Sequence, residues 1–139
     1  MKRSPGKSHC PINFTLELLG DNWSLLILRD IHLFGKRRFK DFLESEEGIS
    51  TNILADRLGK LERSGILEKV HGLYQPTEKG LDLLPLLIEM SLWGAKYDPN
   101  TSAPPEFVMW AKSDPEAFRK GVEEIAEGTR PPPLARLPI

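Results

Sequence analysis

The chain has 139 residues, of which 40% are hydrophobic and 28% charged, enough for one domain with a hydrophobic core. Its single cysteine excludes an internal disulfide and a cysteine-rich zinc site, and its three histidines show no metal-ligand spacing, so no cofactor is expected. No apolar run is long enough to cross a bilayer, and none follows the basic residues 1–8 as a signal peptide requires. We therefore expect a cytoplasmic protein without membrane association.

The net charge of −1 is unevenly distributed along the chain. Residues 1–80 carry 13 Lys/Arg against 11 Asp/Glu, whereas residues 81–139 carry 6 against 9. The first part of the chain is therefore slightly basic. This balance permits nucleic-acid binding without demonstrating it.

The first predicted elements are a basic arm over residues 1–10 and a helix over residues 11–19. Proline suits the first turn of a helix, and position 11 is a proline. Apolar residues recur at helical spacing along this segment, namely Ile12, Leu16 and Leu19. Gly20 ends the helix.

A second helix is predicted from Trp23 to about Phe34, with Asp21 or Asn22 as its cap and Gly35 as its end. Nearly all of its residues are apolar. A helix that is apolar all round is usually buried, so this one is expected at the centre of the core.

Two further helices joined by a short polar turn predict a helix-turn-helix. The first runs from Phe39 to about Ser45. The second is capped by Ser50 and runs to about Ser64, with Gly65 in the position that a C-terminal glycine prefers.

A small β-hairpin is predicted next, with strands over 66–70 and 73–75 and a turn at His71-Gly72. Pro76 ends it because proline cannot donate to the ladder. A helix capped by Thr77 is then expected from Leu81 to about Lys96, with its proline near the first turns.

Beyond this helix, residues 98–105 have the composition of a linker, and two weaker helices are predicted over 106–112 and 114–127. The expected fold class is mainly α with a small β-wing, an α+β winged helix-turn-helix with dimerisation helices at its N- and C-terminal sides. Its parts are a basic arm (1–10), a DNA-binding and dimerisation domain (11–97), a linker with a helical extension (98–130) and a Pro-rich tail (131–139).

The helix at 50–64 has one buried stripe and one polar face. The stripe consists of Leu54, Leu58 and Leu61. The opposite face consists of Asn52, Asp56, Gly59 and Arg63, flanked by Ala55 and Lys60. Small residues let a helix approach the major groove, asparagine can pair with adenine, and cations hold phosphate. An ordinary solvated face is the alternative, and the wheel alone does not decide between the two.

Other residues complete the candidate DNA interface. Ser50 and Thr51 lie at a helix N-terminus, where hydroxyl and free N–H groups bind phosphate or base edges. Asp56 repels phosphate, but it can accept from a cytosine amine or pair with Lys60 or Arg63. The remaining candidate cations lie at the start of the preceding helix and on the hairpin: Arg37, Arg38, Lys40, Lys69 and His71.

Five segments in register, from about Cys10 to Gly94, resemble the HxlR family of bacterial winged-helix regulators, relatives of the MarR group. They are CPINFTLELLGDNWSLLILRDI, KRRFKDF, GISTNILADRLGKLERSGIL, YQPTEKG and LLPLLIEMSLWG. The resemblance implies a dimeric regulator, with a repressor favoured over an activator, that binds a roughly palindromic operator. It also implies that 50–64 is the recognition helix and 66–76 the wing. The wing is shorter than is usual in the family, and the chain continues well beyond the resemblance.

A dimer also follows from the helix after Thr77, which is apolar on two sides. One stripe consists of Leu84, Ile88 and Leu92, and the opposite side of Leu83, Leu86, Leu87 and Met90. One winged-helix core covers one face only. We expect the second face to meet a partner subunit together with Ile12 and Leu16 of the first helix, the alternative being that the C-terminal extension folds over it.

Two kinds of effector are considered. Some regulators of the HxlR family sense oxidants or electrophiles through a cysteine at the position of Cys10, which here stands beside a helix start near Lys7 and His9. With no second cysteine, only an intersubunit disulfide, a mixed disulfide or an adduct is available, and an inert thiol is the favoured alternative. A small apolar ligand is the second kind, in a groove lined by Phe14, Trp23 and Trp93, although the two tryptophans are more typical of core anchors.

Two other functional classes are weighed. An enzyme is not expected, because the sequence has no Ser-His-Asp order, no phosphate-binding glycine loop and no recognisable carboxylate pair. The main alternative is a winged-helix module that contacts proteins, with weak or no DNA binding. The near-neutral charge, the short wing and the Pro-rich tail favour it, and the salt dependence of DNA binding separates it from a DNA reader.

Overall fold

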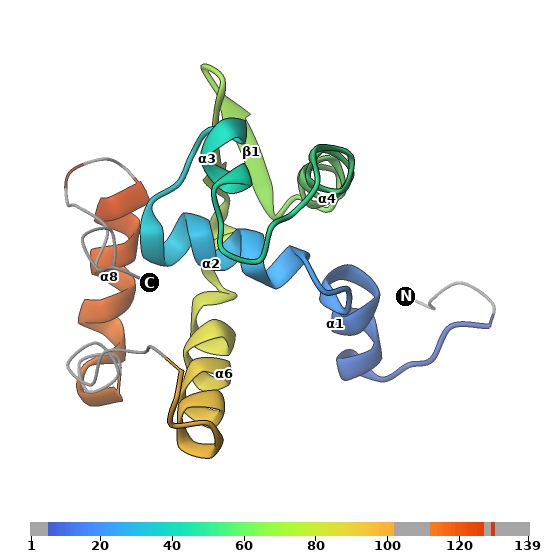
Figure 1. The fold of residues 1–139 in the computed structure, drawn as a ribbon. Helices are drawn as coiled ribbons and strands as arrows, with labels where there is room; N and C mark the ends of the chain where they lie inside the picture. Colours follow the sequence, from blue (N-terminus) through green and yellow to red (C-terminus); the bar gives the residue numbers. More distant parts are fainter. Residues whose placement is uncertain (1–5, 102–111, 127–128, 130–139) are drawn as a thin grey trace.

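The computed structural model describes residues 6–101, 112–126 and 129. Its elements follow the chain in the order α1 (Pro11–Leu19), α2 (Ser24–Phe34), α3 (Phe39–Leu43), α4 (Thr51–Arg63), β1 (Leu67–Val70), β2 (Leu73–Pro76), α5 (Glu78–Leu81), α6 (Leu84–Tyr97) and α8 (Pro115–Ala126). Figure 1 shows α3, α4 and the hairpin in the upper part of the molecule, with α6 and α8 extending below α2. The predicted fold class, helices with a small β-wing, is confirmed.

Helix α2 is the central element of the core, as its composition predicts. Asp21 caps it: one carboxylate oxygen accepts from the backbone N–H groups of Trp23 and Ser24 at 2.8 and 2.9 Å, and the other accepts from the Ser24 hydroxyl at 2.6 Å. The N-cap position is thus Trp23, and Asp21 rather than Asn22 supplies the side-chain hydrogen bonds to the helix N-terminus. Besides Leu19 of α1 and Leu87 of α6, the other buried residues of this core come from the helix-turn-helix and the hairpin, namely Phe42, Ile49, Leu54, Leu58, Leu61, Ile66, Leu67 and Tyr74.

The helix-turn-helix and the hairpin form where they are predicted. Ser50 caps α4 by accepting from the backbone N–H of Ile53 at 3.3 Å. The hairpin turns at His71 and Gly72, both at positive φ (50° and 78°), which is the type I′ geometry that matches the twist of a two-residue hairpin. The backbone N–H of Tyr74 also donates to the carbonyl of Arg37 at 2.8 Å, which fixes the hairpin to the segment before α3.

The helix predicted from Leu81 to about Lys96 is present, with Pro85 in its first turn as predicted, but it begins at Leu84 rather than at Leu81. The structure has the short helix α5 and, after a break, α6. Thr77 caps α5, accepting from the backbone N–H of Gly80 at 3.2 Å. Pro85 lies in the first turn of α6 because its ring cannot accommodate the carbonyl of Leu81 four residues earlier in a continuous helix.

Helix α8 packs against the core rather than standing apart from it. Phe118 is fully buried in a second cluster with Leu33 of α2 and Leu84 of α6, and Figure 1 shows α8 beside both helices. Arg119 of α8 also pairs with Asp82. The predicted helix at 106–112 lies almost entirely, and the Pro-rich tail entirely, outside the described residues. Within the described part of the chain, no helix is long and apolar enough to span a membrane.

Candidate nucleic-acid interface

Helix α4 separates a buried leucine face from an exposed polar face, as the helical wheel predicts. Leu54, Leu58 and Leu61 are buried. The exposed residues include Ser50, Thr51, Asn52, Ala55, Asp56 and Arg63, with Lys60 partly buried. At Gly59 an added Cβ atom would lie 3.0 Å from the Arg63 guanidinium, so the Arg63 side chain lies across the glycine. The first turns of α4 therefore present short polar side chains to solvent, and its last turn presents cations.

Exposed cations flank this surface on two neighbouring elements. Arg38 and Lys40 are exposed at the start of α3, and His71 is exposed at the hairpin turn. Lys69 on β1 is exposed, and its ammonium group lies 5.1 Å from the ring centroid of Tyr74, which limits where the side chain points. Exposed cations on elements next to a groove-bound helix are the kind of group that contacts a phosphate backbone.

Arg37 does not belong to this exposed set, contrary to the prediction. Its guanidinium donates to the carbonyl of Ile31 at 3.2 Å and to that of Lys36 at 3.3 Å, and burial lowers its pKa. Lys36 also turns inward and donates to the Ser45 hydroxyl at 2.9 Å. The run of basic residues at 36–40 thus divides into two cations that serve the fold and two that face solvent.

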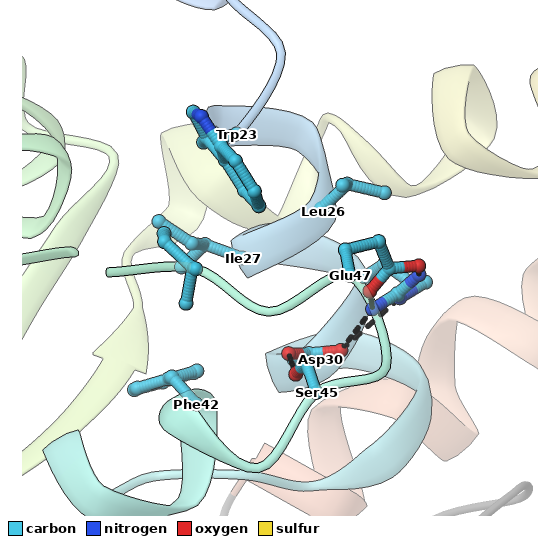
Figure 2. A pocket seen from close by; sticks show the side chains of 9 residues that line it. Trp23, Leu26, Ile27, Asp30, Phe42, Ser45 and Glu47 are labelled. Atoms are coloured by element: carbon cyan, nitrogen blue, oxygen red, sulfur yellow. Dashed lines mark hydrogen bonds and ion pairs between the residues drawn. The ribbon is translucent and has the colours of Figure 1, made fainter. Parts of the chain in front are cut away.

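A buried carboxylate, which the sequence analysis missed, fixes the turn before α4 (Figure 2). Asp30 is 2% exposed and accepts from Arg29 at 2.8 and 3.1 Å and from the hydroxyl of Ser45. Arg29 also binds both carboxylate oxygens of Glu47, at 2.7 and 2.8 Å. Burial lowers the pKa of Arg29, but the bond to Glu47 and the charge of Asp30 outweigh it and raise the pKa above its ordinary value. This network ties residues 45–47 to α2.

The pocket beside this network is small. It has about 10 Å³ available to a water-sized molecule, roughly what one water requires. Trp23 lines it, but Phe14 and Trp93 do not. This pocket is therefore not the groove predicted between the dimer helices and the core, and a ligand in that groove stays a prediction. The alternative that Trp93 is a core anchor is wrong, because its side chain is 70% exposed.

Asp56 pairs with Arg57 rather than with Lys60 or Arg63. The Arg57 guanidinium donates to Asp56 at 2.5 Å through one terminal nitrogen and to Asp21 at 3.1 Å through Nε. Burial raises the pKa of Asp21, but the hydrogen bonds from Ser24, Trp23 and Arg57 outweigh it and lower the pKa to about 2. The recognition-helix candidate is thus tied to the corner between α1 and α2.

The predicted dimerisation residues divide into two groups. Leu87 is 6% exposed within the main core, and Leu83 packs against that core, so neither offers an open surface, in contrast to the prediction. Leu86 and Met90 are exposed on α6, as are Ile12 and Leu16 on α1. The exposed apolar set also includes residues that the prediction did not assign to it: Phe14, Trp93 and Tyr97. Helix α8 covers the other side of α6, at Leu84 and Ile88.

Cys10 is exposed directly before α1. Its backbone N–H donates to the hydroxyl of Ser8 at 3.0 Å, and its carbonyl accepts from the N–H of Phe14 at 3.1 Å. The thiol is therefore open to reagents from solution.

Two helices joined by a short turn, followed by a hairpin whose turn carries exposed polar residues, define a winged helix-turn-helix protein. The chain belongs to the HxlR-like helix-turn-helix family, whose model matches residues 18–102. Helix α8 lies beyond that match.

The proteins to which this chain is similar are named as transcription regulators or transcription factors. An uncharacterized HTH-type transcriptional regulator of Bacillus subtilis, YybR, is 33% identical over 97 residues, which cover 65% of this chain and 77% of YybR. Among solved structures, PA1607, a putative transcription factor, superposes with a TM-score of 0.62 at 37% identity, covering 70% of this chain and 73% of PA1607. Quinone-bound YodB from B. subtilis superposes with a TM-score of 0.55 at 36% identity, covering 63% of this chain and 99% of YodB.

Proposed function

We propose that this protein binds double-stranded DNA sequence-specifically as a homodimer and regulates transcription, with α4 as the helix that enters the major groove. One observation carries the proposal. The leucine face of α4 is buried in the core, its opposite face and its capped N-terminus are exposed, and the neighbouring α3 and hairpin carry exposed cations. A groove-reading helix requires this combination, because phosphate contacts set its position and base contacts read the sequence.

The side chains divide by chemistry into these two kinds of contact. Asn52 and Asp56 lie where base edges would be read, and Ser50 and Thr51 lie where the helix N-terminus meets a base edge or phosphate. The remaining residues of the proposed interface would contact the DNA phosphate backbone: Arg38, Lys40, Lys60, Arg63, Lys69 and His71. Arg37 is removed from the proposed interface because its guanidinium binds carbonyl groups of its own chain.

A second copy of the chain would give the regulator the two-fold symmetry of a palindromic operator. Trp93 and Met90 on α6 are 70% and 48% exposed, and the Trp93 and Tyr97 rings lie 5.2 Å apart as one aromatic surface. Apolar patches of this kind on a soluble chain mark interaction surfaces. A two-fold dimer through α1 and α6 would present two copies of α4 to DNA about one helical turn apart, which predicts a roughly palindromic operator.

An effector response at Cys10 is a second part of the proposal. The similar protein YodB has been solved in a quinone-bound state, and Cys10 is exposed at the start of α1, next to the proposed dimer surface. DNA binding with and without diamide, in the wild type and in Cys10→Ser, tests this. We expect diamide to change binding by the wild type only, and identical responses would remove the switch.

Selection of bound sequences from a random DNA pool tests the function itself. We expect enrichment of two inverted half-sites about one helical turn apart. No enrichment at low salt would contradict DNA reading and favour a winged-helix module that contacts proteins. A reporter gene placed behind the selected operator tests the expectation of repression, which predicts lower expression when the protein is present.

A further inference from the structure

Arg57 of α4 lies between two carboxylates that belong to different parts of the fold. Its Nε donates to Asp21 at 3.1 Å, and one terminal nitrogen donates to Asp56 at 2.5 Å. Asp56 belongs to the exposed face of α4, and its side chain is 63% exposed, whereas that of Arg57 is 26% exposed. The guanidinium therefore sits below the proposed DNA-reading surface, with a carboxylate of that surface bound to it.

Asp21 is a fixed anchor for this arrangement. Three donors of the α2 N-terminus hold its carboxylate, namely the backbone N–H groups of Trp23 and Ser24 and the Ser24 hydroxyl. The Asp21 side chain is only 19% exposed, and α2 is the central helix of the core. An anchored Asp21 fixes Nε of Arg57, and the planar guanidinium then fixes the direction of its remaining nitrogens.

The bond from Arg57 lets the Asp56 carboxylate lie close to DNA and accept a hydrogen bond there. A lone carboxylate on a reading face repels phosphate, whereas a carboxylate paired with an arginine is offset in charge and held in one orientation. Since Arg57 donates to one oxygen of Asp56, the other oxygen is available to accept from a base. A carboxylate only accepts hydrogen bonds, so its partner in the major groove must be an exocyclic amine.

Two bases present an amine in the major groove, and their neighbouring groups separate them. Adenine places its N7 acceptor next to its amine, and that acceptor repels a carboxylate. Cytosine presents its N4 amine without an adjacent acceptor of its own, and Asp or Glu accepts from cytosine N4.

We propose that Asp21 and Arg57 form a positioning pair that holds Asp56 to read a cytosine in each half-site of the operator. Arg57 acts through Asp56 and does not itself contact DNA. The inference rests on the proposed function, because it assigns one base preference to the helix proposed to enter the groove.

Parallel selections from one random DNA pool test this inference, using the wild type, Asp56→Ala, Arg57→Gln and Arg57→Lys. Glu62→Gln, which also removes a negative charge from α4, is the matched control. We expect the wild type to enrich cytosine at one position of each half-site. Asp56→Ala and Arg57→Gln should both lose this preference at that position by about tenfold, within the range of one good base contact, and leave the other positions unchanged. Arg57→Lys should retain part of the cytosine preference, and the control Glu62→Gln should retain all of it.

Thermal unfolding of each variant separates positioning from a structural role. A structural role would lower the melting temperature and weaken binding to all sequences alike, whereas positioning changes the ratio of affinities for the cytosine duplex and its substituted counterpart. Wild-type base preferences in Asp56→Ala or Arg57→Gln would overturn this inference and leave the proposed function standing. No enrichment by the wild type would overturn both.

Discussion

His32 and Gly80 join α2 to α5 through one buried hydrogen bond, in which the imidazole Nε2 lies 3.1 Å from the glycine carbonyl oxygen. Because a carbonyl can only accept, Nε2 carries the proton of the neutral ring. Nδ1 is then buried without a hydrogen-bond partner among the described residues. Burial lowers the pKa of His32 to about 4, with a further contribution from the charge of Arg37, against the bond to Gly80, which raises it.

This depressed pKa predicts acid sensitivity of the fold. An unfolded histidine has a pKa near 6.5 and the folded one near 4, so the unfolded state binds the proton first as the pH falls. The contribution to stability is fully present above pH 6.5 and is lost progressively towards pH 4, by up to about 3 kcal/mol. Urea unfolding between pH 7.5 and 4 measures it. His32→Gln should flatten this part of the pH profile, and the exposed His71→Gln should not. Parallel profiles for the wild type and His32→Gln would contradict the assignment.

Gly80 is predicted to tolerate no side chain. A Cβ atom there would lie 2.2 Å from the carbonyl oxygen of Ile66 and 3.2 Å from the Cβ atom of Pro76, so α5 would have to move away from the hairpin. We expect Gly80→Ala to lower the free energy of unfolding by roughly 1–3 kcal/mol. Gly94→Ala in α6 is the matched control, because nothing lies within 4 Å of its added Cβ atom. Equal urea midpoints for the two variants would show that the contact is easily relieved.

Helix α8 is predicted to stabilise the winged-helix core. Phe118 is fully buried against Leu33 and Leu84, so Phe118→Ala should cost about 3–5 kcal/mol if the site cannot collapse. The exposed Lys120→Ala in the same helix is the control. Thermal unfolding and limited proteolysis measure the effect, and a melting temperature of Phe118→Ala equal to that of the control would mean that α8 contributes nothing to the core.

The two sides of α6 are predicted to respond differently to truncation. Leu87→Ala removes a buried core side chain and should lower unfolding stability by about 2–5 kcal/mol. Trp93→Ala removes an exposed ring and should instead weaken self-association, which light scattering across a dilution series measures. A monomeric wild type at micromolar concentration, or an unchanged dimer in Trp93→Ala, would contradict the proposed dimer surface.

Sequence patterns predicted the backbone of this protein better than the partners of its side chains. The span of α4, the hairpin turn at His71-Gly72 and the central place of α2 follow from caps, glycines and apolar periodicity, which are local properties. The break before α6 was missed because apolar residues continue across it. The exposure of Trp93 was missed because an apolar residue carries no mark that separates a core from an interface.

The partners of charged residues depend on long-range geometry. Arg37 and Arg38 are neighbours of one type, yet only the first reaches backbone carbonyls of its own chain. Asp21 and Arg57 stand 36 positions apart, and no local spacing relates them. Asp30 could not be foreseen as the centre of a network, since its partners Ser45 and Lys36 come from the segments around α3.

The salt dependence of DNA binding tests the central claim most directly. Fluorescence anisotropy with a duplex carrying the selected operator should show the wild-type affinity falling by roughly a thousandfold or more between about 50 and 200 mM salt. Arg38→Ala should weaken binding to all sequences and lower the salt slope by about two, because each of the two subunits loses one phosphate contact. Asn52→Ala should relax base preference at a cost of about 1–3 kcal/mol and leave the slope unchanged. No binding at 50 mM salt, or the same response from both variants, would contradict the assignment of α4 as a reading helix flanked by phosphate contacts.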